Sequence, residues 1–201
     1  MKIEIKKIRH RDYKVAIEII IKELHLDLFI KNKLLQKIYG RYFWYLYMNK
    51  ATSAYGAFSK TRFMGLLLIE MQNEFTIHDS LFENIYLKIF GFIKKLFLKN
   101  LNLIEKTNIE LLKDYLEYSN TDGQILFFGI INTNHYKKVR EVLFNELKED
   151  EYNKNIYLYA DDYSLSNFEE VNFKKIKEKK IKINTINGEI TFNCYLCDKK
   201  I

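Results

Sequence analysis

The stretch QILFFGIINTNHYKKVREVLFNEL, residues 124–147, decides the fold. Its first half is an apolar run, which predicts a strand over 125–131. Its second half changes to helical spacing, which predicts a helix over 135–149. Lys137, Lys138 and Arg140 fall in the first turn and a half of that helix, where the helix dipole disfavours positive charge. This placement favours a helix start that faces an anion, although a solvated amphipathic helix would explain the same residues.

Before this stretch the sequence predicts strands and helices in a mixed order. Alternation and helical spacing indicate a strand over 2–8, helices over 12–25 and 31–48, and a hairpin over 52–59 and 62–71. A helical segment over 79–117 follows, and we expect it to break between Asn100 and Asn108.

After this stretch we expect a strand over 155–160, a short helix from Ser164 and a closing hairpin. The hairpin should turn at Asn187-Gly188, because a type I′ turn needs positive φ at both positions. The order of elements predicts a mixed α/β sheet that is antiparallel at both ends, with a parallel crossover at its centre.

The composition predicts one globular domain spanning 1–201. Hydrophobic residues make up 48% of the 201 residues and charged residues 29%, as in proteins that bury their own core. The longest apolar runs, MGLLLIEM and ILFFGII, fall well short of the roughly 20 residues that span a membrane. The charged, alternating N-terminus is unlike a signal peptide. We therefore expect a cytoplasmic protein with no membrane partner.

The formal net charge of +7 is compatible with nucleic acid, a membrane surface or anionic small molecules. A composition rich in Lys, Ile and Asn, without Pro, accounts for much of this charge with no partner at all. The run KKIKEKK, residues 174–180, alternates like a strand, so its cations are spread over both faces. Because no nucleic-acid-binding motif is present, nucleic-acid binding is the weakest alternative.

Cys194 and Cys197 form a CxxC pattern in the segment EITFNCYLC. The segment alternates like a strand, and strand residues three apart point to opposite faces. No second pair is present to complete a zinc site. We expect two unrelated structural thiols and no bound metal.

The order of elements resembles the GNAT superfamily of N-acetyltransferases over nearly the whole chain. The resemblance is sharpest over 124–176, in the opening stretch and in NIYLYADDYSLSNFEEVNFKKI. It implies a GNAT-like acyl-CoA N-acyltransferase fold with a helical insertion between the third and fourth strands. It also implies acetyl-CoA as acyl donor and an amine as acceptor, bound by a monomer or homodimer. The aromatic helix end at 42–47 and the 52–71 hairpin would border the acceptor.

The resemblance also implies a cofactor site. The start of the helix over 135–149 matches the motif that binds pyrophosphate, at His135, Tyr136, Lys137, Lys138, Val139 and Arg140. The motif glycines, which let backbone approach phosphate, are missing, so the side chains at their positions, Lys138 and Arg140, could replace them. The preceding strand would face the pantetheine arm with Phe128, Gly129, Ile130 and Ile131. A glycine within a strand often marks close approach of a ligand or another backbone.

The usual catalytic residues of the family are replaced in this sequence. Gln124 stands where some members have a glutamate base, and Phe168 stands where many have a tyrosine acid. Phe168 would then line the cofactor site, whereas a shift of one residue would place Glu169 there. Among replacement groups, Glu70 is the candidate base and Tyr163 the candidate acid. For each of the two residues, a hydrogen-bonding or surface role is the alternative, and the sequence favours it.

The match to the family's last phrase places Asn172 at a glycine position, and Asn tolerates the left-handed conformation that a helix end often needs. Two hypotheses follow from the resemblance as a whole. In the first, the chain transfers an acetyl group to the amine of a small molecule or peptide. In the second, it binds CoA in the same fold but has little or no activity.

Overall fold

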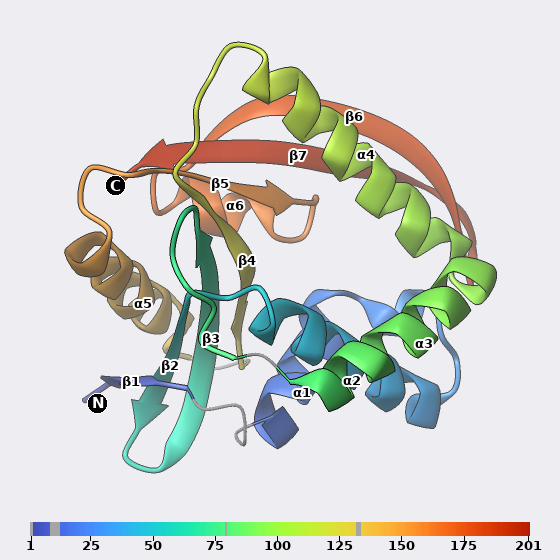
Figure 1. The fold of residues 1–201 in the computed structure, drawn as a ribbon, viewed down its shortest axis with the longest axis horizontal. Coiled ribbons are helices and arrows are strands. Elements are labelled where there is room, and N and C mark those ends of the chain that lie inside the picture. The colour runs from blue at the N-terminus through green and yellow to red at the C-terminus, as the bar shows by residue number, and fades with distance from the viewer. Residues whose placement is uncertain (1, 9–12, 79, 132–133) are drawn as a thin grey trace.

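The computed structural model describes residues 2–8, 13–78, 80–131 and 134–201. Seven strands form one sheet in the order β1-β2-β3-β4-β5-β7-β6, drawn in Figure 1. The strands are β1 (Glu4–Lys7), β2 (Ser53–Ser59), β3 (Arg62–Met71), β4 (Gly123–Ile130), β5 (Asn155–Ala160), β6 (Lys174–Thr185) and β7 (Gly188–Lys200). The helices are α1 (Tyr13–Glu23), the 3-10 turn η2 (Leu26–Leu28), α2 (Lys33–Met48), α3 (Leu81–Phe97), α4 (Lys99–Leu116), α5 (Tyr136–Asp150) and α6 (Leu165–Glu169).

The sheet is mixed, as the sequence predicted. β4 and β5 are parallel, and every other neighbouring pair is antiparallel. The crossover between β4 and β5 runs through α5, because parallel neighbours cannot be joined by a tight turn. The helical insertion between the third and fourth strands is confirmed as α3 and α4.

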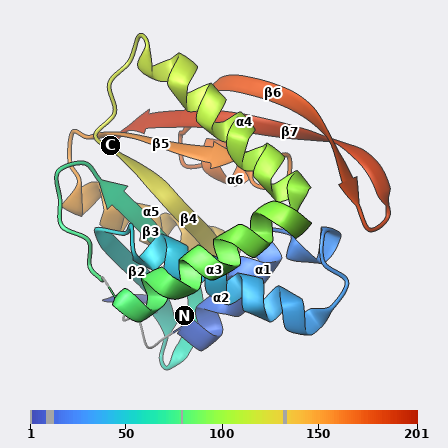
Figure 2. The same ribbon diagram turned by 45° about the vertical axis from the view of Figure 1, so that its right-hand side comes forward.

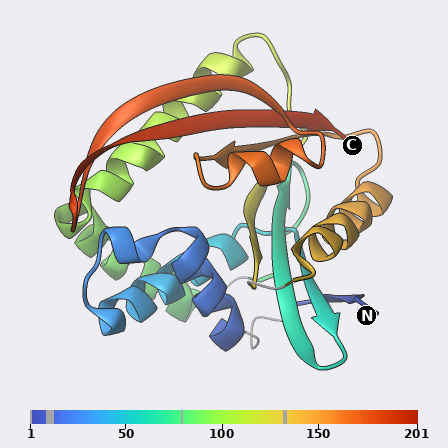
Figure 3. The same cartoon turned by 180° about the vertical axis from the view of Figure 1, so that it is seen from behind.

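Helices cover both faces of the sheet. One face packs against α5 and α6 through Val139, Leu143, Leu147 and Phe168, and these helices come forward in Figure 3. The other face packs against α1 and α2 near β3 and β4, and against α4 near β5 and β7. The buried stripe of α5 follows the helical spacing that the sequence showed.

The insertion breaks earlier than the sequence predicted. Instead of breaking between Asn100 and Asn108, the helical segment breaks at Leu98, whose φ of −113° and ψ of 56° are not helical. Leu98 is buried, so packing of this side chain decides the position of the break, whereas the asparagines were chosen on local propensity.

The closing hairpin also turns differently from the expected type I′ geometry. Thr185 pairs with Gly188, so Ile186 and Asn187 form the two-residue loop. Gly188 alone of the expected turn pair has positive φ, at 117°. Ile186 N donates to Leu28 O at 2.9 Å. The local sequence pattern could not predict this tertiary contact with η2.

The two cysteines occupy opposite faces of β7, as expected. Cys194 packs in the cluster beneath α4, and Cys197 packs in the cluster beneath α5. Both are free thiols, and burial raises the pKa of each to about 12. Within the described ranges, no three His, Cys, Asp or Glu residues are grouped to hold a metal ion.

Of the helices that the structure describes, none is long and apolar enough to cross a bilayer.

Candidate functional site

The centre of the sheet opens into a wedge between β4 and β5. In the described structure their ladder consists of two pairs, Gly123 with Ile156 and Gln124 with Tyr157. The other edge of β4 is held by β3 and the other edge of β5 by β7. Beyond Gln124 the facing edges of the two strands therefore carry backbone N–H and C=O groups without a strand partner, and such groups need another partner.

A β-bulge lies at the point where the wedge opens. Leu68 pairs with Phe127 and Ile69 with Ile125, which leaves Leu126 without an opposite residue on β3. A bulge takes one residue out of the ladder and bends the strand. Its position beside the last β4–β5 pair means that β4 bends at the residue where β5 leaves it.

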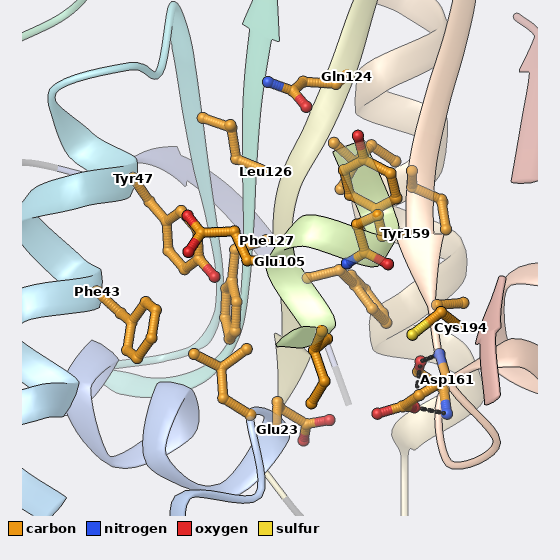
Figure 4. Close-up of a pocket in the computed structure, with 18 of the residues that line it drawn as sticks. Glu23, Phe43, Tyr47, Glu105, Gln124, Leu126, Phe127, Tyr159, Asp161 and Cys194 are labelled. Atoms are coloured by element: carbon orange, nitrogen blue, oxygen red, sulfur yellow. Dashed lines mark hydrogen bonds between the residues drawn. The ribbon is translucent and has the colours of Figure 1, made fainter. Parts of the chain in front are cut away.

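A cavity of about 470 Å³ fills the wedge and the space beneath α4. Figure 4 shows side chains from α1, α2, the strands and the insertion pointing into it. Its walls are largely apolar and aromatic, with Phe43 and Tyr47 from α2 and Phe127 from β4. The insertion contributes a helical stripe, which consists of Leu101, Ile104, Glu105, Asn108, Ile109 and Leu112. Burial raises the pKa of the Tyr47 phenol, with the charge of Glu105 acting in the same direction.

Charged groups line parts of the same cavity. Lys94 and Glu105 form an ion pair at 2.6 Å, in which the Lys94 side chain is buried and the Glu105 side chain is half-exposed. Glu23 lies at the end of α1, and burial raises the pKa of its carboxyl group, with Lys22 acting in the opposite direction. The cavity thus combines apolar walls with a few charged groups, as ligand sites commonly do.

The closed end of the wedge holds a carboxylate and two phenols. Glu70 lies opposite Gln124 in the β3–β4 register, and the Gln124 amide donates to the Glu70 carboxylate. Tyr157 and Tyr159 follow on β5, with ring centroids 5.7 Å apart. Burial raises the pKa of Tyr157 to about 12, and the negative charge of Glu70 adds to the effect. Gln124 and both tyrosines line the cavity, whereas Glu70 does not. Glu70 is connected to the cavity through its hydrogen bond with Gln124.

The three cations at the start of α5 differ in their exposure to solvent. Lys137 and Lys138 are exposed, whereas Arg140 is buried, with only 2% of its surface accessible. The Arg140 guanidinium pairs with the Glu170 carboxylate and also reaches Asn167 Oδ1 at 3.4 Å. Arg140 therefore ties α5 to α6 and the turn that follows it. Residues 132–133, which precede this helix start, lie outside the described residues.

Solved structures share this fold across the whole chain. A Drosophila melanogaster polyamine N-acetyltransferase, which catalyses formation of N-acetylagmatine, matches over 100% of both chains with a TM-score of 0.60 and 7% identity. Arabidopsis thaliana NAA60, solved with a bisubstrate analogue, matches over 100% of this chain and 98% of its own, with a TM-score of 0.54 and 12% identity. The Escherichia coli ribosomal-protein-S18-alanine N-acetyltransferase matches over 100% and 94%, with a TM-score of 0.51 and 8% identity.

The chain has the GNAT fold. Identities this low establish the fold alone. No profile of a known protein family and no curated protein matches the sequence.

Two of the residues that the GNAT resemblance assigns to the cofactor lie at the cavity. Phe128 and Phe168 both line it, with ring centroids 5.6 Å apart. The ring centroid of Phe144, on α5, lies 5.2 Å from that of Phe128. The position that holds a tyrosine in many GNAT members therefore belongs to an aromatic cluster beneath α5 and α6.

The next three assigned residues of β4 and its end have close protein neighbours. A Cβ at Gly129 would meet Glu23 Cγ at 2.9 Å and also Ile19, so the close approach at this glycine is to α1. Ile130 is fully buried in the core. Ile131 N donates to Met64 O at 2.9 Å. None of the three is among the cavity-lining residues.

The candidate acid Tyr163 is 56% exposed and packs on His25, with ring centroids 4.3 Å apart. His25 lines the cavity, and Tyr163 does not. Asn172 has φ of 67°, which confirms the left-handed conformation expected from its match to a family glycine.

Sequence reasoning missed several polar residues that the fold brings to the cavity, namely Glu23, His25, Lys94 and Glu105. Nothing in their local sequence marks them, because they come from three separate helical elements. The helical spacing of the α4 stripe was the available signal, but its inward direction depends on tertiary packing.

Proposed function

We propose that the chain is an acetyl-CoA-dependent N-acetyltransferase that acts on the amine of a small molecule or peptide. The observation that supports this most strongly is the wedge between β4 and β5 with a cavity of about 470 Å³ within it. An extended chain that carries amides, such as pantetheine, can hydrogen-bond to an open strand edge in the manner of an added strand.

The phosphates of the donor would lie at the start of α5. The helix N-terminus supplies backbone N–H groups and the positive end of the dipole. Lys137 and Lys138 are exposed there, and their cations would supplement the dipole in place of the missing motif glycines. Arg140 contributes indirectly, because its pair with Glu170 fixes α5 against the turn after α6.

The reacting carbonyl would lie beside the bulge at Leu126. A backbone N–H released from the ladder there is a suitable donor to the oxygen that becomes negative during attack on the thioester. Glu70, held by Gln124 at the closed end of the wedge, would take up the proton of the attacking amine through one water molecule.

The departing CoA thiolate needs a proton. Tyr163 is one candidate donor, and Tyr159, which lines the cavity directly, is the second. Burial raises the pKa of Tyr159, which keeps this phenol protonated at neutral pH. Substituting each tyrosine by phenylalanine, and comparing the rate of CoA release, decides between them.

The proposal is tested by calorimetric titration of acetyl-CoA and CoA, followed by measurement of thiol release with a panel of amines. Binding together with amine-dependent release supports it. The protein's own thiols are buried, so their background with a thiol reagent should be slow. Absence of binding at millimolar ligand would reject acetyl-CoA as the acyl donor. Binding without turnover on any amine would favour the alternative of a CoA-binding protein without catalysis.

Nucleic-acid binding gains little support from the lysines of β6. Lys177 and Lys179 pair with acids of α4, at 3.6 Å from Asp114 and 2.7 Å from Glu110. Lys175 pairs with Glu178 at 2.8 Å. Cations already paired in this way offer less charge to a phosphate backbone.

A further inference from the structure

Helix α3 packs against the core through Tyr86, Leu87 and Phe90, buries two of its charged residues and exposes a second set of apolar residues. Its one acidic residue, Glu83, is 5% exposed, and Lys94 is 4% exposed. By contrast, five large apolar side chains are between 53% and 85% exposed, and these are Leu81, Phe82, Ile85, Ile89 and Phe92. A surface helix normally shows the opposite arrangement. Figure 2 brings α3 to the front of α1 and α2.

The inward charges fix this orientation. Glu83 lies 3.0 Å from His78 Nε2, and Lys94 pairs with Glu105 of α4 at 2.6 Å. The nearest atom to a Cβ built at Gly91 is the Tyr42 hydroxyl of α2, at 3.5 Å. Rotating α3 to bury this outward face would break the Lys94–Glu105 ion pair and the Glu83–His78 hydrogen bond, so the outward apolar face is a property of the folded structure.

The outward face forms a continuous stripe with cations beside it. Phe82, Ile85, Ile89 and Phe92 follow one another at spacings of three and four residues, which places them in one row along the helix. Lys88 and Lys95 are exposed and stand three residues after Ile85 and Phe92, so they lie along one edge of this row.

We propose that this outward face of α3, the α3 stripe, docks on the surface of a bilayer that contains anionic lipids. The helix would lie in the plane of the interface, with Leu81, Phe82, Ile85, Ile89 and Phe92 in the acyl boundary. Lys88 and Lys95 would lie at the level of the headgroups. Apolar residues on one face with lysines beside them are the pattern of helices that bind at membrane interfaces.

The area and charge of the stripe favour a membrane over a second copy of the chain. Five side chains exposed to this degree present on the order of 600 Å² of apolar surface, less than the roughly 800 Å² per partner that a stable protein interface buries. In a two-fold dimer with antiparallel helices, the lysines of both copies would also lie along the same side of the interface. An anionic bilayer complements these lysines and the net charge of +7.

This inference is independent of the proposed function, because the stripe lies outside the cavity. It revises the expectation of no membrane partner, which rested on the absence of a spanning run. An interfacial helix needs an apolar face and flanking cations, and neither property requires 20 consecutive apolar residues.

The test is flotation of the full chain with vesicles of phosphatidylcholine alone and with vesicles that contain about one-third phosphatidylglycerol. We expect most of the protein to float with the anionic vesicles and at least about fivefold less with the neutral ones. Binding to the anionic vesicles should weaken as salt rises from 50 to 500 mM, because the lysine contribution is screened.

A triple variant, Ile85→Gln, Ile89→Gln and Phe92→Gln, removes the apolar row, and we expect at least tenfold weaker partitioning. Its matched control is Leu34→Gln with Ile186→Gln, which removes two apolar side chains, 67% and 51% exposed, elsewhere on the surface. We expect the control to float like the parent. Lys88→Glu with Lys95→Glu should reduce flotation with anionic vesicles and leave the weak binding to neutral vesicles unchanged.

Circular dichroism and thermal unfolding establish that each variant is folded. The proposal is overturned if the folded parent does not float with anionic vesicles, or if the triple variant floats as well as the parent. It is also overturned if light scattering shows a dimer that the triple variant dissociates and vesicles do not compete with, because the stripe would then be an interface between copies.

Discussion

At the scale of single residues, Glu70, the proposed base, is oriented by the neighbouring Gln124. The family glutamate position is occupied by Gln124, and the carboxylate stands directly across the ladder on β3. The Gln124 amide donates to this carboxylate. An amide can orient a carboxylate but cannot accept the proton, so under the proposed function Glu70 would be the base and Gln124 would orient it.

For Glu70→Gln we expect kcat to fall by about 10²-fold or more, because the proton acceptor is lost, while the Kd for acetyl-CoA stays within about twofold. Steady-state kinetics and calorimetry measure the two quantities. Glu74→Gln, an exposed carboxylate shortly after β3, is the matched control and should leave kcat unchanged. Full activity in the Glu70 variant would remove this residue from the mechanism.

Glu23 gives a prediction about pH. Burial raises the pKa of its carboxyl group above the ordinary value of 4.5, so the folded chain holds this proton more tightly than the unfolded chain does. Stability must then fall as pH rises from about 4.5 through the raised pKa, and the loss persists at higher pH.

For Glu23→Gln we therefore expect a melting temperature above that of the parent at pH 8, by about 2–4 °C if the cost is about 1 kcal/mol. The gap should shrink towards pH 4. Glu18→Gln changes an exposed carboxylate on the same helix and should show no such trend. Calorimetric scans across this pH range measure the effect, and a gap that is constant with pH would contradict the explanation.

At the scale of elements, the start of α5 separates a structural cation from two exposed ones. Arg140 is buried in its pair with Glu170, whereas Lys137 and Lys138 face solvent. The resemblance assigned phosphate contact to this whole stretch, and the burial of Arg140 now distinguishes between its members.

We expect Arg140→Met to lower the free energy of unfolding by about 1–3 kcal/mol, with a change in the Kd for acetyl-CoA of less than about threefold. Lys137→Ala with Lys138→Ala should have the opposite pattern. The free energy of unfolding should stay within about 0.5 kcal/mol of the parent, and the Kd for acetyl-CoA should rise about tenfold or more. Urea denaturation and calorimetry separate the two effects. If Arg140→Met abolished binding without loss of stability, Arg140 itself would be the phosphate ligand.

Much of the element order could be predicted from the sequence, because local patterns carry it. The α5 stripe, the 155–160 strand and the opposite faces of Cys194 and Cys197 follow from periods of 3.6 and 2 residues. The break at Leu98 and the turn at Ile186-Asn187 were missed, because a buried side chain and a bond to Leu28 decide them.

At the scale of the whole molecule, an ion pair joins the two helices of the insertion to each other. Lys94 on α3 is buried, and its ion pair with Glu105 crosses the break between the two helices. Removing one member of a buried pair leaves an uncompensated charge, which costs about 3–5 kcal/mol when both partners are buried and less here, because Glu105 is half-exposed.

We expect Glu105→Gln to increase deuterium exchange in α3 and α4 while the strands β3 and β4 keep their protection. Adding Lys94→Met should restore protection, because the double variant leaves no buried charge. Mass spectrometry after exchange reads both regions in one experiment. If the single variant exchanged like the parent, the ion pair would have no part in holding α3 against α4.

The wedge and the orientation of α3 could not be predicted from the sequence, because both depend on tertiary packing. The pattern of β4 predicts a strand but not the residue at which its neighbour leaves it. The pattern of α3 predicts an amphipathic helix but not which face is buried. Here the contacts of Glu83 with His78 and of Lys94 with Glu105 keep these two side chains inward.

The short pairing between β4 and β5 is the weakest connection in the backbone ladder of the sheet. Along the backbone ladder, the half-sheets β1–β4 and β5–β7 are joined at Gly123–Ile156 and Gln124–Tyr157 in the described structure. A ligand whose amides bonded to both free edges would add hydrogen bonds between the two half-sheets, in the manner of an inserted strand, and hold them more rigidly together. Slower deuterium exchange of the Ile125–Ile130 amides on adding CoA would record that stiffening, and unchanged exchange would show that the ligand does not bridge the halves.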